Sequence, residues 1–167
     1  SRQLAARIER WPIAGSFTIS RGAKTEAVTV VAEVSHVGRS GRGECVPYPR
    51  YGESPASVAE IIASVRSFVE GGVTREDLQA LLPPGAARNA LDCALWDLRA
   101  KEAGTPVWNL AGLSAPNPVT TAFTIGLGDE QEVRRKAREA RDYPLLKLKV
   151  DAERHLGLVR AVREEHP

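Results

Sequence analysis

The sequence is poor in the residues that mark several classes of protein. Its 167 residues include two cysteines and no methionine, and aromatic side chains make up only 5%. The cysteines, Cys45 and Cys93, are too few for a disulfide framework and match no metal-ligand spacing, so we expect free, buried thiols in a protein of the reducing cytoplasm. Because an initiator methionine is missing, we expect a processed or incomplete form of the protein.

Charge and hydrophobicity narrow the range of partners. Lys plus Arg number 23 and Asp plus Glu number 21, so the net charge of +2 gives no electrostatic reason to expect nucleic acid or an anionic membrane as a partner. No apolar run approaches the roughly 20 residues of a membrane-spanning helix, and no apolar signal segment opens the chain. The content of 43% hydrophobic and 26% charged residues is typical of a soluble globular protein, and whether it forms homo-oligomers stays open.

The first part of the chain has the pattern of an α+β domain. Residues 2–13, 27–37 and 41–46 alternate apolar and polar side chains or are β-branched, which predicts antiparallel strands. Glycines between these segments predict the turns, at Gly15, Gly22 and Gly38.

Two helices should complete this domain. The first is predicted from Ser54 to the glycine pair 71–72, and the second from Pro84 to Ala103. The apolar face of the first helix consists of Val58, Ile61, Ile62, Val65 and Phe68. The apolar stripe of the second consists of Ala87, Ala90, Leu91, Ala94, Leu95 and Leu98. We therefore predict an α+β domain over residues 1–115.

The sequence pattern changes after Pro118. Strands are predicted at 119–127 and 145–150, and helices at 129–141 and 152–165. The order strand, helix, strand, helix with short connections is typical of a parallel βαβα unit. A TIM-type barrel needs eight βα units. Residues 116–167 are therefore predicted to form the first two βα units of a TIM-type (β/α) barrel that is incomplete in this chain.

The most informative segment is the strand that carries Lys147 and Lys149. Side chains alternate along a strand, so both lysines share one face, with Cα atoms about 7 Å apart. A solvated strand face is the simplest explanation of such a pair. In a barrel, however, this face points inward, where a lysine is costly unless it serves a site near the C-terminal mouth. A neighbouring positive charge disfavours the protonated form of a lysine, which suits such a pair to proton transfer beside anionic groups.

Two motifs resemble those of one enzyme family over essentially the whole chain. Lys147-Leu148-Lys149 resembles the K-x-K motif on the second barrel strand of the muconate-lactonizing branch of the enolase superfamily. Residues 87–98, ARNALDCALWDL, resemble the helix that joins the capping domain to the barrel in that branch. The resemblance implies that the α+β domain is the capping domain of such an enzyme.

A third motif is more specific. Residues 43–53, GECVPYPRYGE, resemble the signature of dipeptide epimerases, notably those acting on L-Ala-D/L-Glu, in a loop over the barrel mouth. A purely conformational explanation is that Pro47, Pro49 and Gly52 shape a tight connection. The resemblance instead implies that Tyr51 contacts the substrate.

The resemblance also implies a reaction and further site residues. A Mg²⁺-dependent epimerase abstracts the proton α to the C-terminal carboxylate of a dipeptide, and the metal stabilises the resulting enediolate. Lys149 is then one of the two acid/base residues, and Lys147 neutralises the carboxylate. Arg21, in the loop FTISRG, is implied to pair with a substrate carboxylate, to which its planar guanidinium is suited. Thr124 is implied to contact the substrate from the end of the first barrel strand.

The same resemblance places the metal ligands and the opposing lysine beyond Pro167. Asp92 and Asp97 belong to a helix, and Asp151 follows the second barrel strand, so we assign none of them to a metal. On this reading residues 1–167 alone should be inactive and should not bind Mg²⁺ at a catalytic site.

Other functions share these features. A muconate cycloisomerase, an o-succinylbenzoate synthase or an N-acylamino acid racemase uses the same lysine pair and metal, and an inactive fragment is a further alternative. The signature of residues 43–53 and Arg21 favour the dipeptide epimerase.

Overall fold

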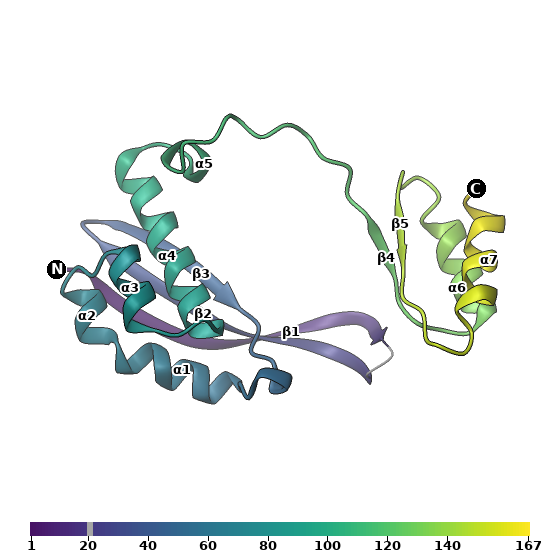
Figure 1. The fold of residues 1–167 in the computed structure, drawn as a ribbon, viewed down its shortest axis with the longest axis horizontal. Helices are drawn as coiled ribbons and strands as arrows, with labels where there is room; N and C mark the ends of the chain where they lie inside the picture. Colours follow the sequence, from purple (N-terminus) through teal and green to yellow (C-terminus); the bar gives the residue numbers. More distant parts are fainter. Residues whose placement is uncertain (20–21) are drawn as a thin grey trace. The chain divides into compact units, whose positions relative to one another are not determined.

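The computed structural model describes residues 1–19 and 22–167 (Figure 1). The chain divides into two compact units: unit 1 contains residues 1–11 and 27–116, and unit 2 contains residues 12–26 and 117–167. The predicted order, an α+β module followed by two βα units, is confirmed. No helix in the described part of the chain combines the length and the apolar content that crossing a membrane requires.

A three-stranded sheet opens the chain, in the order β1 (Gln3–Ile19), β2 (Gly22–His36) and β3 (Arg39–Cys45). β1 and β2 are longer than predicted, and Gly15 lies within β1, so the turn predicted there is wrong. β2 and β3 pair antiparallel from Val30↔Cys45 to His36↔Arg39. The turn between them contains Val37 and Gly38, whose φ angles of 45° and 74° both lie in the left-handed region.

The predicted helix after Ser54 is divided into α1 (Pro55–Ser64) and α2 (Arg66–Glu70). Ser54 begins α1 with a capping box: its hydroxyl accepts from the backbone N–H of Ser57, and the Ser57 hydroxyl accepts from that of Ser54. The helix is interrupted at Val65, which has φ −100° and ψ 10°. The buried face continues through the interruption at helical spacing and includes Val69, whereas Phe68 and Ile61, predicted on the apolar face, are exposed.

Two short helices, α3 (Arg75–Leu81) and α5 (Val107–Leu110), lie outside the predicted elements. The long helix α4 (Ala86–Ala103) is confirmed, and all six residues of its predicted apolar stripe are buried. Figure 1 shows α4 lying along the sheet.

The contact between α4 and β3 depends on two glycines. β3 turns Gly41, Gly43 and Cys45 toward the interior. A Cβ atom at Gly43 would lie 1.9 Å from the carbonyl oxygen of Ala90, and one at Gly41 would lie 2.1 Å from that of Ala94. The strand can therefore approach the helix backbone only where it carries no side chain.

Unit 2 contains β4 (Phe123–Ile125), α6 (Glu130–Glu139), β5 (Leu146–Leu148) and α7 (His155–Glu165). Its apolar cluster joins the two strands to the two helices and consists of Ile125, Leu127, Val133, Ala137, Leu146, Leu148, Leu158 and Val162. The strands are shorter than predicted, because β4 and β5 pair only with each other within the described residues. Residues 111–122, which precede β4, are exposed and have no regular secondary structure.

Candidate active site

The lysine strand has the geometry that its sequence predicts. β4 and β5 pair in parallel, with Thr124 opposite Lys147 and Ile125 opposite Leu148. The backbone N–H of Lys149 donates to the carbonyl of Ile125 at 2.9 Å, which continues the pairing past the end of β5. Ile125, Leu146 and Leu148 pack against α6 and α7. Because side chains alternate along a strand, Thr124, Lys147 and Lys149 lie on the face away from those helices.

The two lysines differ in exposure, and neither side chain has a partner among the described residues. Lys147 is exposed and Lys149 is half-buried. Neither ammonium group forms an ion pair or a hydrogen bond with any described residue. Both charges therefore remain available to an anionic ligand, and the half-burial of Lys149 reduces its contact with water.

The tip of the β1–β2 hairpin contacts the end of β4. The carbonyl of Thr18 accepts a hydrogen bond from the backbone N–H of Leu127 at 2.9 Å. A Cβ atom at Gly126 would lie 3.3 Å from the same carbonyl, so the two segments meet closely there. This contact lies two to three residues after Thr124. Arg21, predicted to bind a substrate carboxylate, lies outside the described residues.

Tyr51 lies in unit 1, in the short 3-10 helix η1 (Pro49–Tyr51). Its side chain is 74% exposed, and its ring meets that of Tyr48 edge to face at a centroid distance of 6.5 Å. Gly52 follows with a left-handed φ of 73°, which ends the turn. The exposed ring is free to contact a ligand, whereas Thr124 and the lysines belong to unit 2.

The signature of residues 43–53 combines residues of two kinds. Gly43 permits the contact with α4, and Cys45 lies in the core of unit 1. Burial raises the pKa of Cys45 to about 11, and its thiol donates to the carbonyl of Val30 at 3.5 Å, so this cysteine is no nucleophile. Tyr48 and Tyr51 are exposed. Part of the signature is thus structural, and the rings of Tyr48 and Tyr51 lie at the surface.

The second cysteine corrects one prediction. Cys93 is exposed, so the expectation of two buried thiols is wrong for this residue. It lies on the side of α4 that faces away from the apolar stripe, because the neighbouring positions 91 and 94 are the ones that pack against the core.

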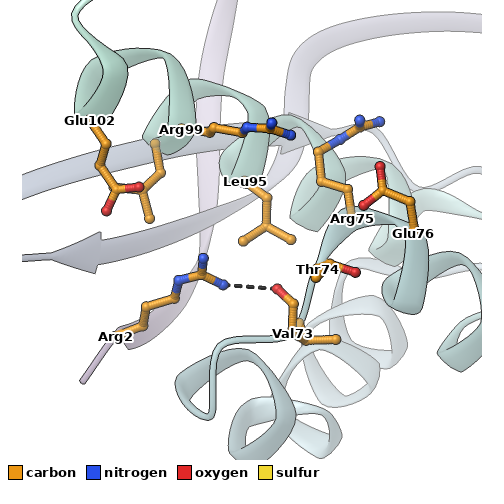
Figure 2. Close-up of a pocket in the computed structure, with 9 residues that line it drawn as sticks. Arg2, Val73, Thr74, Arg75, Glu76, Leu95, Arg99 and Glu102 are labelled. Atoms are coloured by element: carbon orange, nitrogen blue, oxygen red, sulfur yellow. Dashed lines mark hydrogen bonds between the residues drawn. The ribbon is translucent and has the colours of Figure 1, made fainter. Parts of the chain in front are cut away.

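One cavity in each unit is relevant to the predicted site. One, in unit 2, has a volume of about 490 Å³ and is lined by Thr124 but by neither lysine; its other lining residues are Ile13, Ala14, Phe17, Phe123, Gly126, Arg135, Lys136, Glu139, Ala140 and Tyr143. Another, of about 390 Å³ in unit 1, is lined by Arg2, by residues 73–76 at the start of α3 and by α4 (Figure 2). There Arg2 donates to the carbonyl of Val73 at 2.8 Å, and Arg75 pairs with Asp92 and stacks on Trp96. Since these groups stabilise the fold and no predicted site residue lines the unit 1 cavity, we assign no substrate to it.

The described residues do not form a metal site. Among them, no group of three or more His, Cys, Asp or Glu side chains could hold a metal ion. The Asp97 carboxylate accepts from Lys101 at 2.7 Å, and Asp151 accepts from Arg154 at 2.6 Å. The hydrogen bonds from Arg154 lower the pKa of Asp151. These carboxylates serve ion pairs, and the residues present do not fit Mg²⁺.

An α+β domain, followed by parallel βα units with a lysine pair on the helix-free face, defines the N-terminal part of an enolase-superfamily protein. The chain belongs to the mandelate racemase / muconate lactonizing enzyme family, whose N-terminal domain matches residues 1–112.

Known relatives support this assignment. The chain is 47% identical over 148 residues to the L-Ala-D/L-Glu epimerase of Escherichia coli (strain K12), a match that covers 89% of this chain and 46% of the relative. A crystal structure of an enolase family member from Agrobacterium tumefaciens, with homology to dipeptide epimerases and with bound sodium and L-Ala-L-Glu, matches at a TM-score of 0.94 and 45% identity, covering 100% of this chain and 51% of that one.

A dipeptide epimerase from Enterococcus faecalis V583, complexed with Mg and L-Leu-L-Tyr, matches at a TM-score of 0.85 and 27% identity, covering 98% of this chain and 49% of that one. The chain spans about half the length of these relatives.

Proposed function

We propose that this chain supplies the capping domain, residues 1–115, and the first two βα units, residues 116–167, of a dipeptide epimerase of the L-Ala-D/L-Glu type. The observation that carries the proposal is the shared face of Lys147, Lys149 and Thr124, opposite the helices α6 and α7. The proposal is supported by the 47% identity to the Escherichia coli epimerase.

In this proposal Lys149 is an acid/base residue. Its neutral amine removes the proton from the α-carbon of the C-terminal residue of a dipeptide, and the electron pair of the C–H bond passes into the adjacent carboxylate. Lys147 lies two residues away on the same face and neutralises the charge that develops there. Return of a proton to the opposite side of the α-carbon, by a group that the described residues do not include, completes the epimerisation.

The remaining residues of the proposed site bind the substrate. Thr124 lies opposite Lys147 on the neighbouring parallel strand, about 5 Å away, close enough to contact the same ligand. Tyr51 is exposed on its turn, and Arg21 is proposed to pair with a substrate carboxylate. We propose Mg²⁺ as the cofactor of the complete enzyme, because magnesium accompanies a dipeptide in the Enterococcus faecalis structure. We also propose the cytoplasm as its location, since Cys45 and Cys93 are both free thiols.

The test is α-proton exchange in the complete enzyme that carries this chain. L-Ala-L-Glu and L-Ala-D-Glu are incubated in D₂O, and deuterium incorporation at the glutamyl α-carbon is followed by NMR. Lys149→Ala should lower exchange from at least one epimer by about 10²-fold or more, the usual contribution of general acid–base catalysis. Lys147→Ala should be similarly damaging. Lys101→Ala, which removes a lysine paired with Asp97 on α4, is the matched control and should leave exchange unchanged.

Two results would contradict the proposal. Near-normal exchange from both epimers in Lys149→Ala would remove this lysine from the acid/base role. Exchange of N-acylated amino acids, but of no dipeptide, would assign the enzyme to the racemase alternative.

A further inference from the structure

Helix α4 begins without a cap from its own sequence. Its N-cap residue is Gly85, which has no side chain to accept from the backbone N–H groups of the first turn. Instead, Oε1 of Glu53, which is 33 positions earlier in the chain, accepts from the backbone N–H of Ala86 at 2.7 Å. A carboxylate at this position is also favoured by the helix dipole.

Glu53 also binds the other end of its own loop, residues 48–53. The backbone N–H of Tyr48 donates to Oε2 of Glu53 at 3.5 Å, and the backbone N–H of Glu53 donates to the carbonyl of Tyr48 at 3.3 Å. Within the loop, the backbone N–H of Tyr51 donates to the carbonyl of Tyr48 at 2.9 Å. The Glu53 carboxylate thus binds both Tyr48, at the start of the turn that carries Tyr51, and Ala86, the first residue of α4.

Gly85 provides the space for this contact. A Cβ atom at Gly85 would lie 2.9 Å from Oε1 of Glu53. The glutamate side chain is flexible, so an added methyl group would displace the carboxylate and leave the backbone in place. Gly85 therefore has two effects. It provides no side-chain cap for α4, and it leaves space for the carboxylate of Glu53 to cap the helix instead.

We propose that Glu53 is a positioning residue: by binding the N-terminus of α4, it holds the loop of residues 48–53 so that the exposed Tyr51 ring has a fixed place toward the dipeptide. This inference rests on the proposed substrate role of Tyr51. Residues at the N-terminus of α4 then influence substrate binding through Glu53, without touching the substrate.

The first measurement is amide hydrogen exchange in the 167-residue chain, with no substrate present. Glu53→Ala should accelerate exchange at Ala86 and Tyr51 by about tenfold, as expected for loss of a charge-assisted hydrogen bond. Gly85→Ala should produce the same acceleration while it keeps the glutamate. Glu53→Gln, whose amide oxygen can still accept from Ala86, should restore most of the protection. Thr74→Ala is the control. The Thr74 hydroxyl caps α3 by accepting from the backbone N–H of Asp77 at 3.0 Å, and its removal should not change exchange in the loop of residues 48–53.

The second measurement is steady-state kinetics of the complete enzyme on L-Ala-L-Glu. Glu53→Ala and Gly85→Ala should raise KM by about tenfold with a much smaller change in kcat, because the loop must be ordered again on binding. Glu53→Gln should recover most of the wild-type KM, and Thr74→Ala should leave KM unchanged.

The two measurements separate the possible failures. Unchanged exchange in Glu53→Ala and Gly85→Ala would overturn the proposal at the level of structure. Accelerated exchange with unchanged KM would overturn the positioning role. A wild-type enzyme with no epimerase activity would refute the proposed function, and with it the substrate role of Tyr51, whatever the exchange rates.

Discussion

Substitution of Gly43 by alanine tests the contact on which unit 1 is built. The added Cβ atom would lie 1.9 Å from the carbonyl oxygen of Ala90, 2.7 Å from the backbone nitrogen of Ala94 and 2.9 Å from the carbonyl carbon of Ala90. All three atoms belong to the backbone of α4, so no side-chain rotation can relieve the overlap. To reach an ordinary contact of 3.4 Å, β3 and α4 must separate locally by about 1.5 Å.

The cost follows from the size of that separation. A gap of 0.5–1 Å already removes about a quarter to a half of the dispersion attraction between atoms, so a larger displacement removes most of it at this interface. Overpacking of a core typically costs about 1–3 kcal/mol, and the backbone overlap places Gly43→Ala at the upper end or above it. We expect a loss of about 3 kcal/mol, equivalent to a fall in Tm of about 6–12 °C for a chain of this size.

Tryptophan fluorescence is the appropriate probe, because all three tryptophans, Trp11, Trp96 and Trp108, belong to unit 1. The free energy of unfolding is measured by urea titration of wild type and Gly43→Ala. The control is Gly157→Ala in α7, where an added Cβ meets no atom within 4 Å and replaces a poor helix former. It should leave the tryptophan transition unchanged. A Gly43→Ala protein within 1 kcal/mol of wild type would show that α4 does not depend on this glycine.

Three further predictions concern other parts of the chain. Val37→Asn should raise stability by about 1 kcal/mol in urea titration, because Val37 has φ 45° in a two-residue turn where Asn before Gly38 is favoured; an unchanged midpoint would refute the strain. Cys93 should react with a thiol reagent at pH 8 while Cys45 reacts only on unfolding. The pKa of Cys45 is raised to about 11, so the contribution of its thiol to stability should be complete below the ordinary thiol pKa and should decline as the pH rises toward 11. In an alkaline titration of the free energy of unfolding, Cys45→Ala should remove this decline. Arg21→Ala should raise KM for acidic dipeptides about tenfold or more with kcat little changed, and a KM within twofold of wild type would exclude carboxylate pairing.

The spacing of apolar side chains in the sequence predicts the elements in which burial follows the regular repeat of a helix or a strand. The stripe of α4 was recoverable because an uninterrupted helix keeps Ala90, Ala94 and Leu98 on one side. The shared face of Lys147 and Lys149 was recoverable because strand alternation requires no knowledge of the rest of the fold.

The same reasoning failed for residues at the edge of an apolar face and for contacts between segments distant in the sequence. Only Val69 continues the helical spacing of the buried residues Ile62 and Val65. Phe68 lies at the edge of that face and is exposed. Neither the hydrogen bond from Ala86 to Glu53 nor the contact between Thr18 and Leu127 has a local signature. The absence of a Ser, Thr, Asp or Asn cap before Ala86 was the one available sign that α4 is capped from elsewhere.

The hairpin formed by β1 and β2 makes the units inseparable by a single cut. The chain passes from unit 1 to unit 2 after Trp11, returns after Glu26, and crosses again after Pro116. Thermolysin cleavage at Leu113 or Val119, both well exposed, should therefore yield a nicked protein whose two pieces remain together, since residues 12–26 stay bound to the βα units. A chimaera could exchange the capping domains of two relatives through a single junction in the exposed segment 111–122. Residues 12–26 would then be combined with the βα units of the other relative. A chimaera that keeps this hairpin tip with its own βα units needs three junctions.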